Sequence, residues 1–89
     1  MDEYLPQSDT IADVESGDWN LVVKKYTGEG PEKGYVDVYL YRTRNRELVD
    51  RRAGPGSESG NLITAVTSKV PGCRDFRQRL MYAIVSTDR

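Results

Sequence analysis

Arginine is concentrated in one short stretch of this chain. The segment RTRNRELVDRR, residues 42–52, holds five arginines in eleven positions. Planar guanidinium groups bind carboxylates and phosphates through paired hydrogen bonds, so such a cluster could hold an acidic protein surface or a nucleic-acid backbone. Charged side chains at a hairpin end can equally be solvated and keep an edge strand from aggregating. The stripe is therefore a candidate site with three competing interpretations.

The positions of these arginines indicate how they would be arranged. They are Arg42, Arg44, Arg46, Arg51 and Arg52. Alternation in an extended strand would place the first three on one side, in line with the aliphatic residues of the same strand. We expect a guanidinium cluster at one hairpin tip, partly neutralised by Glu47 and Asp50.

Tyrosine supplies the second candidate surface. The segment YVDVYLYRTR, residues 35–44, alternates aliphatic residues with tyrosines and one acid. The first set is Val36, Val38 and Leu40, and the second is Tyr35, Asp37, Tyr39 and Tyr41. The aliphatic set should face a helix, and the tyrosines, joined by Tyr26, should face the opposite side of the sheet. Tyrosine suits a half-exposed contact surface, although the rings could also be covered by the N-terminal segment or simply favour strand formation.

Several kinds of chemistry have no residues to support them. The chain contains no histidine, which removes Cys-His and Ser-His-Asp catalysis and most catalytic zinc sites. Its single cysteine, Cys73, permits no internal disulfide and is expected to be buried on a helix. No basic start followed by an apolar run, and no membrane-length apolar run, is present. We expect no catalytic residues, cofactor, metal, membrane span or small-molecule substrate, and a cytoplasmic location (the host cytoplasm if a phage encodes the chain).

The sequence pattern predicts the elements that would carry both surfaces. Segments 19–26 and 35–44 are β-branched and aromatic, as strands are, and the loop between them is rich in glycine. Asn45-Arg46 is expected to form a two-residue turn into a third strand, with a short helix over 46–53 as the alternative. The alternating segment 61–70 predicts a fourth strand, and the apolar stripe of 73–85 predicts a helix.

Charge divides the chain into two regions. Residues 1–20 contain six acidic and no basic residues, whereas residues 42–79 contain nine basic and four acidic ones. We interpret residues 1–18 as an acidic arm in which one or two helical turns could form, and we expect residues 1–15 to be poorly ordered by themselves and dispensable for stability. Residues 19–89 are predicted to form a single domain.

The fold class expected is α+β: a small antiparallel sheet of three or four strands with one C-terminal helix packed on one face. The function expected is a non-enzymatic binding or regulatory module, such as an accessory subunit or a phage-encoded inhibitor. It would dock a protein partner, or a second copy, through an exposed sheet edge and the tyrosine and arginine residues Tyr26, Tyr35, Tyr39, Tyr41, Arg42, Arg44, Arg46, Arg51 and Arg52. The alternative is nucleic-acid binding through the arginine-rich tip at residues 42–52.

Overall fold

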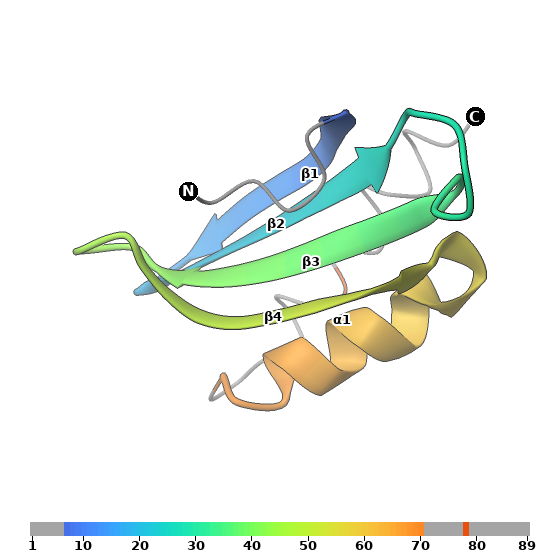
Figure 1. The fold of residues 1–89 in the computed structure, drawn as a ribbon. Coiled ribbons are helices and arrows are strands. Elements are labelled where there is room, and N and C mark those ends of the chain that lie inside the picture. Colours follow the sequence, from blue (N-terminus) through green and yellow to red (C-terminus); the bar gives the residue numbers. More distant parts are fainter. Residues whose placement is uncertain (1–6, 71–77, 79–89) are drawn as a thin grey trace.

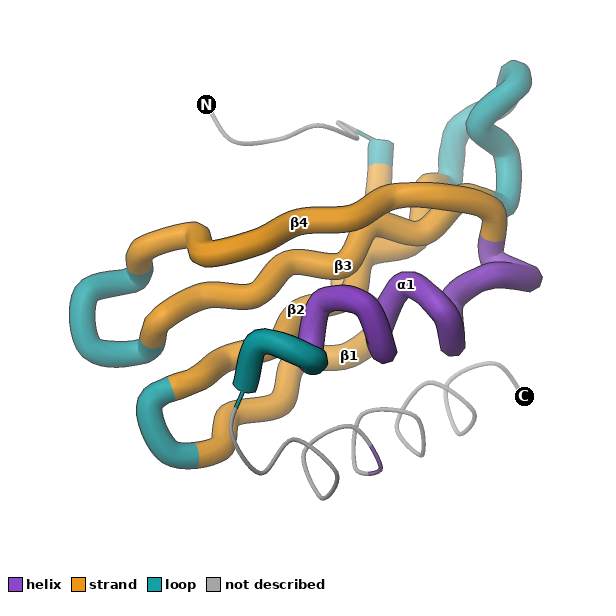
Figure 2. Tube along the Cα trace, turned by 90° about the horizontal axis from the view of Figure 1, so that it is seen from below, coloured by secondary structure: helices purple, strands orange, loops and turns teal. Residues whose placement is uncertain are grey.

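The computed structural model describes residues 7–70 and residue 78. Four strands form one antiparallel sheet whose spatial order follows the chain: β1 (Ser8–Ser16), β2 (Trp19–Tyr26), β3 (Tyr35–Arg42) and β4 (Glu47–Pro55). A short 3-10 helix, η1 (Gly56–Glu58), leads into α1 (Ser59–Thr67), which packs on one face against β3 and β4 (Figures 1 and 2). The predicted α+β class, an antiparallel sheet with a helix on one face, is confirmed.

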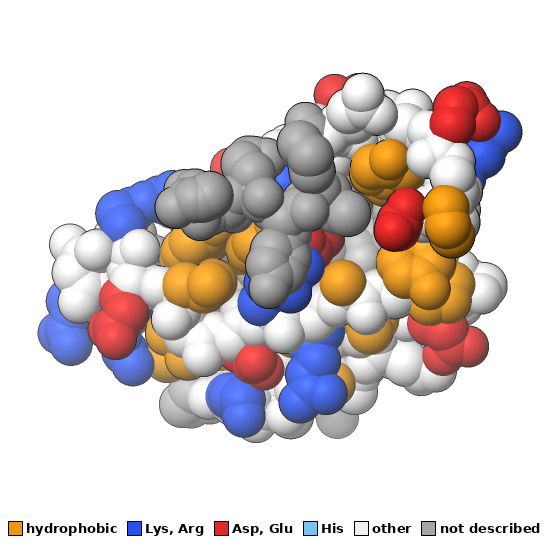
Figure 3. All heavy atoms as spheres, in the orientation of Figure 1, with side chains coloured by type: hydrophobic (Ala, Val, Ile, Leu, Met, Phe, Trp, Pro, Cys, Tyr) orange, Lys and Arg blue, Asp and Glu red, His pale blue; other side chains and the backbone are white. Residues whose placement is uncertain are grey.

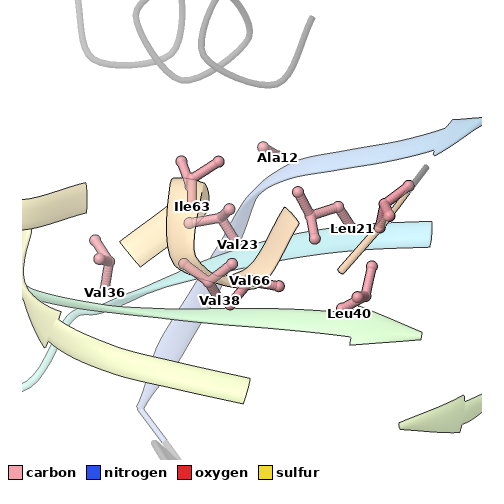
Figure 4. Packing of buried hydrophobic residues seen from close by; sticks show 9 residues of the cluster. Ala12, Leu21, Val23, Val36, Val38, Leu40, Ile63 and Val66 are labelled. Atoms are coloured by element: carbon pink, nitrogen blue, oxygen red, sulfur yellow. The ribbon is translucent and has the colours of Figure 1, made fainter. Parts of the chain in front are cut away.

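The core lies between the sheet and α1 (Figure 4). Val36, Val38 and Leu40 of β3 all point into it, so the side predicted for the aliphatic set is confirmed. The helix that meets them is α1, whereas the sequence assigned this role to residues 73–85, which, apart from residue 78, lie outside the described residues, Cys73 included. The other buried members of the core are Ala12, Leu21, Val23, Ile63, Val66 and Val70.

Residues 8–16 form a strand, so the expectation of helical turns in this segment is wrong. Ala12 and Val14 face the core, while the acidic residues between and after them are exposed, which is the two-residue period of a half-buried strand. β1 pairs with β2 along its length, interrupted by one bulge before Ala12. Gly17 has φ 60°, the positive value that a two-residue hairpin loop commonly requires at its first position. The segment is thus part of the sheet.

The expected fourth strand over residues 61–70 is wrong, because most of this segment belongs to α1. Its alternating β-branched residues suggested a strand. The buried residues are instead Ile63, Val66, Thr67 and Val70, which recur at helical spacing. The Thr67 hydroxyl donates to the Ile63 carbonyl at 2.7 Å, so this β-branched residue is accommodated within the helix.

The connection between β3 and β4 differs from the two-residue turn expected. The strands are joined by four residues, 43–46, and Arg46 rather than Asn45 adopts a positive φ, of 59°. The Asn45 side chain accepts a hydrogen bond from the Glu47 backbone N–H at 3.0 Å. The segment that follows is a strand and not the alternative short helix, with Val49 left without a direct partner at a bulge.

Candidate binding surface

The sheet face opposite α1 carries the tyrosines of β3. Tyr35, Asp37, Tyr39 and Tyr41 alternate with the core residues of the same strand. Tyr39 is paired in register with Val22 of β2 and Arg51 of β4. We call this side of the sheet the tyrosine face.

The centre of the tyrosine face is closed. Asp37 is fully buried, and one of its oxygens, Oδ2, accepts hydrogen bonds from Tyr39 Oη and Arg51 Nη2, both at 2.8 Å. The Tyr39 ring is only 3% exposed, and the cationic groups of Lys24 and Arg51 lie 5.5 and 5.7 Å from its centre. The sequence predicted Tyr39 as a contact residue. Its ring is instead held inside the protein, where a partner cannot stack on it.

The protonation states of this cluster follow from its environment. Burial, together with the hydrogen bond to Asp37, raises the pKa of Tyr39 from 10.0 to about 12. Burial alone would lower the pKa of Arg51, but hydrogen bonds and charge attraction from Asp37 and Tyr39 outweigh it and raise that pKa. At neutral pH the cluster therefore contains a neutral tyrosine and a cationic arginine, and both donate to the carboxylate.

The arginines predicted to form one cluster are divided between the two faces. Arg42 lies on the core side, 3.1 Å from Asp18 and with its Cζ 4.6 Å from the centre of the Trp19 ring. Arg46 lies on the opposite side, against Tyr41. The expected alignment of Arg42, Arg44 and Arg46 is therefore wrong, because β3 ends at Arg42 and strand alternation ends with it.

Three of the five arginines face a carboxylate of the chain. Arg42 pairs with Asp18, Arg51 with Asp37 at 2.8 Å, and Arg52 approaches Asp50 at 4.0 Å. Arg44 and Arg46 have no carboxylate within 4.0 Å among residues 7–70. Both are exposed residues of the turn, so the uncompensated positive charge of the stripe lies there.

Arg46 is held in a defined position. Its Nη1 donates to Asn20 Oδ1 at 3.3 Å, and its Cζ lies 5.3 Å from the centre of the Tyr41 ring. Its backbone N–H donates to the Arg42 carbonyl at 2.8 Å, which closes the turn. A positive φ at a residue other than glycine costs on the order of 1–3 kcal/mol, and Arg46 is the one such residue in the described chain.

Asn20 fixes the direction of the Arg46 side chain. The amide is almost fully buried, and its Nδ2 donates to Asp13 Oδ1 at 2.7 Å and to the Val14 carbonyl at 3.2 Å. Because both acceptors lie on β1, the amide can be oriented in only one way, with its oxygen toward Arg46. Strands β1 and β2, through the hydrogen bonds of Asn20, and strand β3, through Tyr41, thus position the exposed Arg46 guanidinium.

An exposed apolar side chain lies beside this arginine. Leu48 is 47% exposed, more than any other large hydrophobic residue that the structure describes. It is the register partner of the half-buried Tyr41, whose ring stacks on Tyr39 at 6.0 Å with an angle of 4°. Basic side chains gather at this end of the molecule next to hydrophobic ones (Figure 3). We call Tyr41, Arg44, Arg46 and Leu48 the hairpin surface.

The remaining predicted contact residues lie elsewhere. Tyr26 and Tyr35 flank loop 27–34, at the other end of the sheet from the β3–β4 turn, and Tyr26 Oη donates to the Glu29 carbonyl at 3.1 Å. Of the nine residues that the sequence nominated, only Tyr41, Arg44 and Arg46 belong to the hairpin surface.

Sequence reasoning missed Asn20 and Leu48 as parts of this face, and it placed Asp37 on the face without its buried pairing with Arg51. Asn20 could have been noticed, since asparagine is unusual within an apolar strand such as WNLVV. Asp37 carried the same signal within YVDVY. Leu48 gave none, because its exposure depends on the bulge at Val49, which places Leu48 opposite Tyr41.

Other kinds of site are not found in the described part of the chain. Residues 7–70 contain no group of three or more acidic or cysteine side chains placed to hold a metal ion. No helix of the described residues has the length and apolar character needed to cross a membrane. Comparison of the chain with protein-family models, with curated proteins and with solved structures finds no match.

Proposed function

We propose that this chain is a small non-enzymatic binding module that docks a protein partner through the hairpin surface. The observation that carries the proposal is Arg46, an exposed cation kept in a strained backbone conformation and aimed by a buried amide. Strained residues persist where the surroundings hold them, and they concentrate at functional sites. A pre-positioned arginine loses less freedom on binding than a mobile one, which favours affinity.

The composition of the hairpin surface supports a protein as the partner. Tyrosine and arginine are enriched where proteins bind each other, and binding energy is concentrated where they surround an apolar centre. Here the Arg46 guanidinium lies over the Tyr41 ring, and Leu48 is the register partner of Tyr41. The surface is small, which corresponds to a weak or transient interface or to one part of a larger contact.

Side-chain docking is better supported than strand addition at a sheet edge. Each edge strand, β1 and β4, carries one bulge and several charged residues. Bulges and charges are the devices by which proteins keep edge strands from pairing with other chains. Of the surfaces expected from the sequence, we therefore keep Tyr41, Arg44 and Arg46 as contact residues and omit the exposed sheet edge.

Nucleic-acid binding receives less support from the same residues. Single-stranded binders stack bases on open aromatic rings, but Tyr39 is buried and Arg46 lies over Tyr41. Glu47 directly follows Arg46 in the chain, so the positive charge of the turn is modest. A module of this kind would act as an accessory or inhibitory subunit, and we propose the cytoplasm as its location because the single cysteine permits no internal disulfide.

Site-specific photo-crosslinking tests the proposal. A benzophenone amino acid at position 48 should crosslink a discrete protein in cells of the source organism, and the Arg46→Asn variant should abolish that crosslink. Asparagine tolerates positive φ, so the turn is retained while the cation is removed. The control is the same probe at Asn61, an exposed residue of α1. Identical products from both positions, or no product from a folded protein, would contradict the proposal.

A further inference from the structure

We infer that the hairpin surface recognises a partner segment presenting a carboxylate next to a bulky apolar side chain. This inference rests on the proposed function and specifies the chemistry of the partner. The acidic group would pair with Arg46, and the apolar group would cover Leu48 and the edge of Tyr41.

The carboxylate is inferred from the hydrogen-bonding capacity that Arg46 leaves unused. A guanidinium carries five N–H donors. Within the described residues the Arg46 side chain donates one hydrogen bond, to Asn20, and faces no acidic group. Two of the remaining donors are enough for the bidentate geometry in which arginine binds a carboxylate. The contacts with Asn20 and Tyr41 hold the group in place without neutralising its charge.

The local charge favours one carboxylate over a phosphate or a polyanion. Arg44 and Arg46 contribute two positive charges, and the exposed Glu47 removes one. A phosphomonoester carries a charge of about −1.5 to −2 at neutral pH, and a polyanion brings several charges together, so Glu47 would repel either of them more strongly than it repels one carboxylate.

The apolar part of the partner is inferred from Leu48. Nearly half of this residue is exposed, although the other large aliphatic residues within 7–70 are buried fully or in part. An isolated exposed leucine would be unremarkable by itself. Beside an oriented arginine and a half-buried tyrosine, it supplies the apolar centre that binding surfaces commonly place among polar groups.

Selection from a random-peptide phage library, with the full chain as bait, tests this inference. The selected peptides are then synthesised, and their affinities are measured by fluorescence polarisation. We expect enriched sequences with Asp or Glu adjacent to Leu, Ile, Phe or Trp. Replacing that acid by its amide, or introducing Arg46→Asn, should weaken binding about 10- to 100-fold, the range for one charge-assisted pair. Arg46→Lys should recover part of the loss, because it retains the charge without the fork of donors.

The outcomes separate this inference from the proposed function. Peptides whose binding is lost in Leu48→Ser but does not depend on an acid would overturn the carboxylate inference and leave the proposed function standing. Failure to enrich any peptide whose binding depends on Arg46 or Leu48 would contradict both. Stronger binding of a single-stranded oligonucleotide, with affinity falling steeply with salt, would identify a polyanion and overturn the inference. Self-association through this surface in sedimentation, lost in Leu48→Ser, would identify a second copy of the chain instead.

Discussion

Neutralising Asp37 should destabilise the protein strongly. The carboxylate is fully buried and accepts two hydrogen bonds at 2.8 Å, one from the Arg51 guanidinium and one from the Tyr39 hydroxyl. Removing one partner of a buried ion pair typically costs about 3–5 kcal/mol. Because the Arg51 side chain remains 24% exposed and can be partly hydrated, we expect about 2–4 kcal/mol for Asp37→Asn.

A double-mutant cycle measures the coupling between the two charges. Arg51→Met removes the cation and retains an apolar stem, so the Asp37→Asn, Arg51→Met protein contains neither charge. We expect the double variant to lose less stability than the sum of the two single losses, because no buried charge is left without its partner. Chemical denaturation followed by circular dichroism gives each free energy, with an unchanged m value as the check on two-state unfolding.

The Asp50–Arg52 pair provides the matched control. Its atoms are 4.0 Å apart, and the Arg52 side chain is 51% exposed while the Asp50 side chain is 18% exposed, so this longer and more hydrated pair should cost less than about 1 kcal/mol in lost ion pairing on Asp50→Asn. Equal losses for Asp37→Asn and Asp50→Asn would refute the role assigned to burial. Additive losses in the cycle would show that Asp37 and Arg51 do not act as a pair.

Four further expectations concern other parts of the structure. The raised pKa of Tyr39 means that this hydroxyl keeps its proton to a higher pH in the folded protein than in the unfolded chain. The stabilisation that follows is complete below pH 10 and is lost as the pH rises toward 12. Across this transition the unfolding free energy should fall by about 3 kcal/mol more in the natural protein than in Tyr39→Phe. Leu40→Ala should lower the free energy of unfolding, measured by chemical denaturation, by about 2–5 kcal/mol, whereas Leu48→Ala should change it by less than about 0.5 kcal/mol. Equal losses for the two variants would show that Leu48 belongs to the core. Arg46→Asn should change the unfolding free energy by less than about 1 kcal/mol. Arg46→Val should be less stable than Arg46→Asn by about 1–2 kcal/mol, because a β-branched residue tolerates positive φ poorly. Indistinguishable melting curves for these two variants would argue against backbone strain at position 46. Deleting residues 1–16 should lower the melting temperature sharply, since β1 pairs with β2 and Ala12 lies in the core, and a protein that melts unchanged would mean that β1 contributes little.

The strands that the sequence predicted correctly are those whose local pattern and tertiary role agree. In β3, the alternation of Val36, Val38 and Leu40 with polar and aromatic residues matches a sheet covered on one side by a helix. In α1 the local sequence pattern and the tertiary role conflict. Threonine and valine favour strands locally, but burial of Ile63, Val66 and Thr67 against the sheet requires helical spacing.

The candidate site was less predictable than the fold. Alternation predicts which side of a strand a residue occupies, but β3 ends at Arg42 and the alternation ends with it. The direction of the Arg46 side chain depends instead on the positive φ of Arg46 in the turn. The cationic groups beside the Tyr39 ring come from the neighbouring strands β2 and β4, through Lys24 and Arg51, and a pattern within β3 cannot reveal them. Sequence alone therefore identified the residue types of the surface but not which of them remain accessible.

The order of the strands has a consequence for how the chain folds. Each strand pairs only with strands adjacent to it in sequence, through connections at residues 17–18, 27–34 and 43–46. Closing short loops costs little entropy, so each hairpin can form before distant parts of the chain have met. Sheets built from such local pairings fold faster than those that join remote segments. During synthesis, β1 and β2 can pair as soon as both have left the ribosome, and β3, β4 and α1 can then add to that hairpin in the order in which they emerge.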